Sequence, residues 1–279
     1  PDSAVNDVAE DTSAADPGGW RQRTWGGKYN DEAKSLALAA DGGLWIAGYT
    51  ESAGAGDWDG LLMRTTPCGE VTWARTYGAK KKDVLHGVIA TTGGGAAAVG
   101  VSYSFKGFVE AWLVRVNDGG GLVWAASYGG DGFDQASALT ETNDGDFVVL
   151  GETYNFGPGT PDAHNMMLLR VSGKDGKIMW EQTLGGGTDG DAGFALLRTD
   201  AGAGNILVAG ATESYGQGRD DVWITKLDPD GKILWSRAIG GVEDDEARTI
   251  APNGQGGFFL TGFTRTYSHG KADIFLLNV

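Results

Sequence analysis

The sequence has little cysteine, proline, histidine or positive charge. Its single cysteine, Cys68, excludes an intrachain disulfide framework, and three scattered histidines give no basis for a histidine-rich metal site. No apolar run approaches the ~18 residues that a membrane-spanning helix needs, so no transmembrane segment is expected. Lys and Arg number 22 against 37 Asp and Glu, a formal charge of −15. Because such a chain repels phosphate backbones, nucleic acid is not an expected partner.

Glycine is abundant instead, at 48 of 279 positions, together with ten tryptophans. That many tryptophans argue against a disordered chain, and the glycines lack the three-residue period of collagen. A helical bundle is excluded because each interior glycine costs a helix ~1 kcal/mol relative to alanine. The composition therefore predicts a globular all-β chain with many turns.

The first 17 residues differ from the rest of the chain. They hold five acidic residues but no Lys, Arg or aromatic residue, so they cannot bury enough surface to offset the entropy of ordering. We expect residues 1–17 to be an acidic linker or tether and residues 18–279 to be the folded domain. Since the chain starts at Pro1, we also expect a processed or excised chain whose signal peptide has been removed.

An internal repeat organises the folded part. A tryptophan motif recurs five times at spacings of 51 to 56 residues. Between successive motifs come an Asp before a small and apolar stretch, a glycine-rich turn, an apolar run with a central glycine, a loop, and another apolar run. Each unit predicts four strands, and the tryptophan is expected to wedge between neighbouring units. The repeated tryptophans are Trp20, Trp73, Trp124, Trp180 and Trp235.

Repeated sheets of four antiparallel strands predict a five-bladed β-propeller. The apolar runs lack alternation, which suits sheets covered on both faces. The pattern begins at a fourth strand, around Trp20–Trp25, and ends at a third strand at Val279. We therefore expect the N-terminal strand to complete the last blade and to close the ring, which removes exposed sheet edges.

Two positions recur in every blade and are acidic in nine of their ten occurrences, and these nine carboxylates are expected to crowd one rim of the ring. Two interpretations stay open for them. The carboxylates can support the loops by accepting hydrogen bonds from backbone N–H groups, or the first set can bind a cation such as Ca²⁺. No other cofactor is expected. The first set is Asp31, Asp83, Asp134, Asp191 and Asp245, and the second is Asp59, Glu110, Asn165, Asp221 and Asp273.

Departures from the repeat indicate where a ligand binds. Blade two carries a run of three lysines, and blade three has a longer loop that ends at Asn165. We expect a protein or glycan partner at the rim that bears the loops 51–58, 103–109, 154–164, 213–220 and 265–272. The candidate ligand-binding residues are Trp58, Lys80, Lys81, Lys82, Tyr154, Phe156, His164 and Tyr215.

The repeat W-x-x-x-Y-G-G, D-G-G and A-G-x-T-x-S, as in WAASYGG (124–130) and AGATES (209–214), resembles the bacterial β-propeller repeat proteins of the secreted and lipoprotein type. The resemblance covers Gly18–Val279. It implies an exported, non-catalytic binding or scaffold module in the periplasm, at the outer-membrane surface or outside the cell. Anchoring through the N-terminal tail fits the same resemblance.

Two alternatives remain. A lectin-like, carbohydrate-binding propeller would place repeated aromatic residues on the rim loops, but Trp58, Phe108 and Tyr215 do not align with one another. A five-bladed glycoside hydrolase would need two carboxylates in different environments, whereas the repeated acids are near-equivalent copies. Because no nucleophile, metalloprotease or phosphate-binding motif occurs either, we expect the protein not to be an enzyme.

Overall fold

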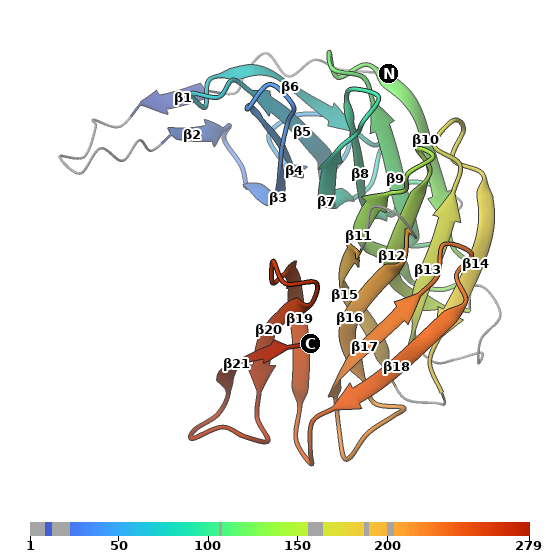
Figure 1. Ribbon diagram of the computed structural model, residues 1–279. Coiled ribbons are helices and arrows are strands. Elements are labelled where there is room, and N and C mark those ends of the chain that lie inside the picture. The colour runs from blue at the N-terminus through green and yellow to red at the C-terminus, as the bar shows by residue number, and fades with distance from the viewer. Residues whose placement is uncertain (1–8, 13–22, 106–107, 156–163, 187–189, 200–203) are drawn as a thin grey trace. The chain divides into compact units, whose positions relative to one another are not determined.

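The computed structural model describes residues 9–12, 23–105, 108–155, 164–186, 190–199 and 204–279. Within these ranges the regular elements are strands, as Figure 1 shows. The same ranges hold no helix with the length and apolar character needed to cross a membrane. The chain divides into two compact units, Pro1–Ser127 and Tyr128–Val279.

The first unit contains two four-stranded sheets and a two-stranded one, all antiparallel. The short sheet pairs β1 (Ala9–Thr12) with β2 (Arg23–Gly26). The first large sheet is formed by β3 (Asp31–Leu38), β4 (Leu44–Thr50), β5 (Asp59–Thr65) and β6 (Val71–Tyr77). The second is formed by β7 (Asp83–Ala90), β8 (Ala96–Ser102), β9 (Glu110–Val116) and β10 (Leu122–Tyr128).

The second unit contains two four-stranded sheets and a three-stranded one, again antiparallel. One is formed by β11 (Asp134–Glu141), β12 (Phe147–Tyr154), β13 (His164–Val171) and β14 (Ile178–Leu184). The next is formed by β15 (Asp191–Arg198), β16 (Ile206–Thr212), β17 (Asp221–Leu227) and β18 (Ile233–Ile239). The last is formed by β19 (Asp245–Pro252), β20 (Phe258–Thr264) and β21 (Asp273–Asn278).

The predicted four-strand repeat is thus confirmed, and its central glycine has a steric cause. A side chain at Gly210 of β16 would clash with the backbone carbonyl oxygen of Ala192 on β15. The strand register shifts between Gly193 and Ala195 at the same level. The first two strands of the sheet therefore approach too closely for a β-carbon, which is the usual reason for glycine inside a strand.

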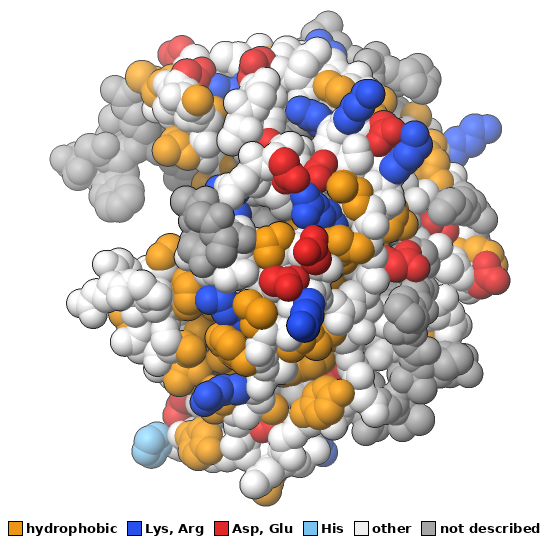
Figure 2. Space-filling model, turned by 45° about the vertical axis from the view of Figure 1, so that its right-hand side comes forward, with side chains coloured by type: hydrophobic (Ala, Val, Ile, Leu, Met, Phe, Trp, Pro, Cys, Tyr) orange, Lys and Arg blue, Asp and Glu red, His pale blue; other side chains and the backbone are white. Residues whose placement is uncertain are grey.

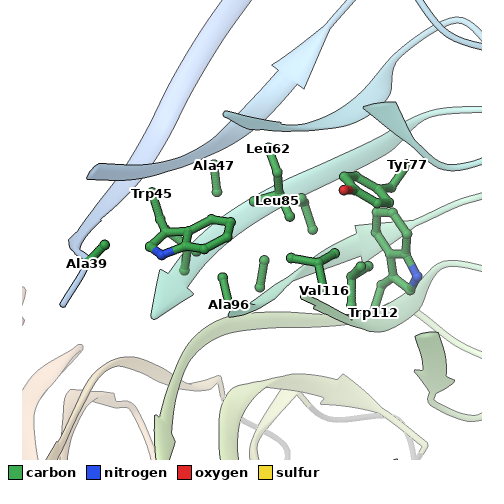
Figure 3. Packing of buried hydrophobic residues seen from close by; sticks show 12 residues of the cluster. Ala39, Trp45, Ala47, Leu62, Tyr77, Leu85, Ala96, Trp112 and Val116 are labelled. Atoms are coloured by element: carbon green, nitrogen blue, oxygen red, sulfur yellow. The ribbon is translucent and has the colours of Figure 1, made fainter. Parts of the chain in front are cut away.

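Apolar side chains fill the space between neighbouring sheets within each unit. In the first unit, Trp45 and Leu62 pack with Leu85 and Trp112 of the next sheet (Figure 3). In the second unit, the outer-strand Trp180 packs on the core between its own sheet and the next one, and its indole N–H donates to the carbonyl of Pro229 at 3.1 Å. This is the wedge role that the repeat predicts for its tryptophan.

The N-terminal strand differs from the prediction. β2 pairs with β1, with Trp25 opposite Glu10, whereas in the described residues the last sheet has three strands and ends at β21. β1 also lies inside the segment that we expected to be a linker. A pairing between strands that are near in sequence closes a short loop at small entropic cost. Trp20 lies outside the described residues.

Candidate functional site

The carboxylates that begin the first strand of each sheet tie the loops together. Asp191 accepts hydrogen bonds from the hydroxyls of Thr212 and Ser214, and Asp83 accepts the Ala79 N–H at 2.8 Å. Equivalent bonds are made by Asp31, Asp134 and Asp245, for example from the Gly241 N–H at 3.1 Å. Loop support is therefore shown directly. The described residues form no group of three or more His, Cys, Asp or Glu that could hold a metal ion.

The acids of the repeat are interior groups and not an exposed rim. Seven of the nine carboxylates are buried: Asp59, Asp83, Glu110, Asp134, Asp191, Asp221 and Asp245. The predicted crowding of the acids at one rim therefore does not give an exposed acidic surface at these residues. Figure 2 shows acidic and basic side chains next to one another on one face of the molecule, among hydrophobic ones. The Ca²⁺ site on the first set stays a prediction.

Acids of the two sets face each other within the second unit. Gly240 lies against both Asp221 and Asp245, and Gly185 lies against both Asn165 and Asp191. Burial raises the pKa of Asp221, and the charge of Asp245 raises it further. Asn165, the single position where the second acid is lost, is thus a neutral replacement inside a buried pair. The loss of the acid at Asn165 therefore reflects packing inside the protein and does not mark an exposed binding residue.

In the first unit, the structure brings together two of the predicted ligand-binding residues. Trp58 stacks on Tyr49 with ring centroids 4.6 Å apart, and the Lys82 ammonium lies 4.1 Å from the Trp58 ring. Lys80 and Lys81 are exposed. Trp58 also packs on a buried apolar cluster, so its principal contacts are with the protein itself.

In the second unit, Tyr154 and His164 face each other at the ends of β12 and β13, with ring centroids 3.8 Å apart. Tyr215 belongs elsewhere, beside Trp223 at 5.4 Å. Phe156 lies outside the described residues. The predicted residues therefore fall into separate places within the described units. Tyr215 lines one cavity of the second unit, and His164 lines another.

That cavity, of about 320 Å³, is the strongest candidate site. We call it the acidic cavity, and its polar and aromatic lining residues are Glu152, His164, Asp191, Phe194, Asp220, Glu246 and Arg248. Its carboxylates come from three successive sheets of the second unit. Sequence reasoning found His164, and found Asp191 as a loop acid or cation ligand, but missed the rest. The position of Glu246 varies between the repeats, and the other four carry Glu, Val, Gln and Ala there. This variation at a repeated position is the sequence signal that the prediction missed.

The carboxyl groups of the acidic cavity are in distinct electrostatic environments. Burial raises the pKa of Asp220 to about 6, and the charges of Glu246, Glu213 and Asp244 add to the effect. Burial also raises the pKa of Glu246, while the positive charge of Arg248 acts in the opposite direction. Asp220 therefore carries a proton at mildly acidic pH and can donate a hydrogen bond there.

A single guanidinium organises one wall of this cavity. Arg248 forms an ion pair with Glu246 and lies 4.1 Å from the centroid of the Phe194 ring. On the opposite side, Glu152 accepts a hydrogen bond of 3.1 Å from the Gln135 amide. The cavity thus offers acceptors, a cationic donor and an aromatic side chain, and at mildly acidic pH the protonated Asp220 adds a further donor. Its acids outnumber its one guanidinium, which disfavours anionic ligands.

No family model and no curated protein matches the sequence, but solved structures resemble it. A protein of unknown function from Bacteroides caccae is 13% identical with a TM-score of 0.56, covering 93% of this chain and 85% of that one. A protein from Lactobacillus plantarum is 15% identical with a TM-score of 0.53, covering 93% and 74%. A thermostable family-43 glycoside hydrolase is 9% identical with a TM-score of 0.50, covering 88% of both chains.

At these identities the likeness concerns the fold alone. Combined with the antiparallel four-stranded sheets, it assigns the chain to the all-β proteins of the β-propeller class.

Proposed function

We propose that this chain is an exported, non-catalytic binding propeller whose ligand is a glycan held in the acidic cavity. The observation that carries the proposal is one cavity of about 320 Å³ that gathers Glu152, Asp220 and Glu246 from three sheets beside Arg248. Each sugar hydroxyl both donates and accepts, and the ionised carboxylates and the guanidinium match both roles, joined at mildly acidic pH by the protonated Asp220. Phe194 adds an apolar surface for the C–H face of a sugar ring.

The location of the cavity agrees with the expected binding rim. His164 and Asp220 are the last residues of the loops 154–164 and 213–220, and both line the cavity. A ligand held there would extend over loops that are free to vary between relatives. Export, and anchoring through the N-terminal tail, belong to this proposal because the sequence repeat resembles secreted propellers.

The test is binding to a glycan array, followed by calorimetry with the glycans that bind. Glu246→Gln removes a charge-assisted acceptor and should weaken binding about tenfold or more. Glu181→Gln is the matched control, because Glu181 is an exposed residue of β14 outside the cavity. Absence of glycan binding by the wild-type chain, or equal affinity for both variants, would contradict the proposal.

One observation favours a second function, glycoside hydrolysis. The raised pKa of Asp220, about 6, separates it from the other carboxyl groups of the same cavity, and glycosidases use a protonated acid opposite an ionised carboxylate. A panel of aryl glycosides tests for turnover. If hydrolysis occurs, Asp220→Asn should remove it while glycan binding persists. Without turnover, the enzyme alternative is excluded and the binding proposal is unaffected.

We also propose that β2 closes a five-bladed ring by adding to the free edge of β21. In the preceding sheet Ile224 lies opposite Arg237, and the repeat aligns Leu276 with Ile224 and Arg23 with Arg237. Ile274 and Leu276 of β21 are 86% and 70% exposed, as expected for apolar residues that an added fourth strand would cover. In a Cys68→Ser background, Arg23→Cys with Leu276→Cys should form an intramolecular disulfide, whereas Arg23→Cys with Ile274→Cys should not. Equal or absent cross-linking would contradict ring closure.

A further inference from the structure

A second concavity of the second unit lies between the outer strands of two neighbouring sheets. It has a volume of about 420 Å³ and is lined by residues of β14, β17 and β18 together with Tyr215. We call it the side groove. Among the residues that the structure describes, it shares no lining residue with the acidic cavity and has no carboxylate in its lining, so its chemistry is different. Its volume is within the range of small-molecule sites.

Tyr215 is fixed across the mouth of the side groove. Its hydroxyl donates to the carbonyl of Gly185 in the preceding sheet at 3.3 Å, and its backbone N–H donates to the hydroxyl of Thr212 at 3.2 Å. Its ring lies 5.4 Å from that of Trp223 yet remains 47% exposed. An aromatic ring that is held by two hydrogen bonds and still faces solvent is a preformed stacking surface.

The side groove also holds hydrogen-bonding groups in fixed positions. The Trp223 indole N–H donates to the Ser236 hydroxyl at 2.7 Å, which orients that hydroxyl beside the aromatic rings. Gln182 of β14 contributes an amide that both donates and accepts. The groove thus combines an exposed aromatic face with neutral hydrogen-bonding groups, and Arg237 is the one charged residue among its described lining residues.

The aromatic residue at the mouth recurs along the chain. Three residues after the Thr or Ser at the end of the second strand, four of the five repeats carry an aromatic residue, and the first repeat carries Ala53; the four are Phe105, Phe156, Tyr215 and Tyr267. Tyr267 repeats the contacts of Tyr215, since its hydroxyl donates to Gly240 and its N–H donates to Thr264, both at 3.1 Å. Phe105 lies 6.1 Å from Trp112, the counterpart of Trp223. Tyr215 therefore belongs to a set of aligned aromatic residues in four repeats, in which its counterpart in the second repeat is Phe105 and not Phe108.

We propose that the side groove binds a pyranose ring, with the C–H face of the sugar on Tyr215 and its hydroxyls on Gln182 and Ser236. The proposal shares its ligand class with the proposed function but concerns a separate site. Recurrence of the same aromatic position means that several weak sites on one chain would add avidity toward a branched or polymeric glycan. A purely apolar partner is disfavoured because it would cover the Gln182 amide without offering it a hydrogen bond.

The experiment uses the full chain with Glu246→Gln, in which binding at the acidic cavity is weakened. Methyl α- and β-pyranosides of glucose, galactose and mannose are titrated by saturation-transfer NMR. We expect saturable binding, which Tyr215→Ala in the same background reduces about tenfold. Tyr29→Ala is the matched control, because Tyr29 is an exposed tyrosine of the first unit and its loss should leave binding unchanged.

Each result decides between the two sites. Loss of all pyranoside binding in the Glu246→Gln background overturns the side groove while leaving the acidic cavity intact. Equal binding by Tyr215→Ala and Tyr29→Ala overturns it as well. Binding that Tyr215→Ala weakens while thermal unfolding stays unchanged supports the side groove, even if the acidic cavity binds no glycan.

Discussion

The acidic cavity of the second unit and an apolar cluster of the first unit occupy equivalent positions of the repeat. The cluster buries Tyr49, Val84 and Val101 and packs Trp58, Tyr103 and Val109 against them. Aligned by the repeat, these positions carry Glu152, Ala192, Ala211, His164, Glu213 and Asp220 in the second unit. One scaffold position is therefore filled by large apolar side chains in one unit and left open, with polar walls, in the other.

The difference shows how a repeated fold acquires a site. The backbone positions are set by the shared residues, namely the buried acids and the central glycine, and these are nearly invariant between the blades. The variable residues beside them determine whether side chains fill the space at this position of the repeat or leave a cavity there. Ala192 and Ala211 replace the larger Val84 and Val101. Their smaller side chains leave a cavity of about 320 Å³.

The largest expected effect comes from converting the cavity into the cluster. Ala192→Val combined with Ala211→Val copies the residues that fit at the equivalent positions of the first unit, so the added methyl groups should narrow the cavity without unfolding the sheet. We expect glycan binding to fall about tenfold or more. Calorimetry measures the affinity, and thermal unfolding reports the fold.

Ala251→Val is the matched control for this double variant, because Ala251 is an exposed residue of β19. It should bind as the wild type does. If the double variant keeps full affinity while folded, the cavity is not the binding site.

The reverse change should open the cluster. Trp58→His puts the second unit's residue into the first unit and removes a ring that stacks on Tyr49. Since large-to-small changes lose both burial and packing, we expect a loss of about 2 kcal/mol in the free energy of unfolding. Urea unfolding measures it. A variant as stable as the wild type would show that the Trp58 ring is dispensable there.

The two regions should also differ in their response to pH. The pKa of Asp220 in the folded protein is raised from 3.8 to about 6, so the folded state holds this proton more tightly than the unfolded chain does. The stabilisation is complete below about pH 4 and is lost as the pH rises through about 6. Asp220→Asn should flatten this part of the curve of melting temperature against pH. An unchanged slope would contradict the assignment; the equivalent Val109 has nothing to titrate.

A smaller effect is expected at the buried acid pair. Because burial and Asp245 raise the pKa of Asp221, the folded state is penalised at neutral pH, where Asp221 loses its proton. Asp221→Asn copies Asn165 of the preceding sheet and should raise the melting temperature by about 2 °C at pH 7. At pH 3 the gain should disappear. A lower melting temperature at pH 7 would show that Asp221 acts through its charge.

The repeating unit was predictable because its signals are local. Turn glycines, the Asp that begins each first strand and the central glycine recur at fixed spacing, and each has one steric or hydrogen-bonding cause. The loop-support role of the acids followed from the same reasoning. Their burial did not, since a carboxylate in a sequence gives no sign of the hydroxyls, such as Thr212 and Ser214, that will surround it.

The candidate site was less predictable because the repeat pattern reveals the residues that the blades share, whereas most residues that line the cavity differ between the blades. Glu152, Asp220 and Glu246 are adjacent to shared residues and come together only through packing of three sheets. The pairing of β2 with β1 was missed for another reason. An acidic segment with few large apolar and no aromatic residues has little strand signal, and in the described residues the backbone of β2 provides the template for Ala9–Thr12.

The most direct test of the account is a crystal structure of the chain soaked with the tightest-binding glycan from the array. The account predicts a sugar ring within hydrogen-bonding distance of Glu246 and Arg248, with Asp220 facing one of its hydroxyls. Full occupancy of the glycan at another surface, with the acidic cavity holding only solvent, would contradict it.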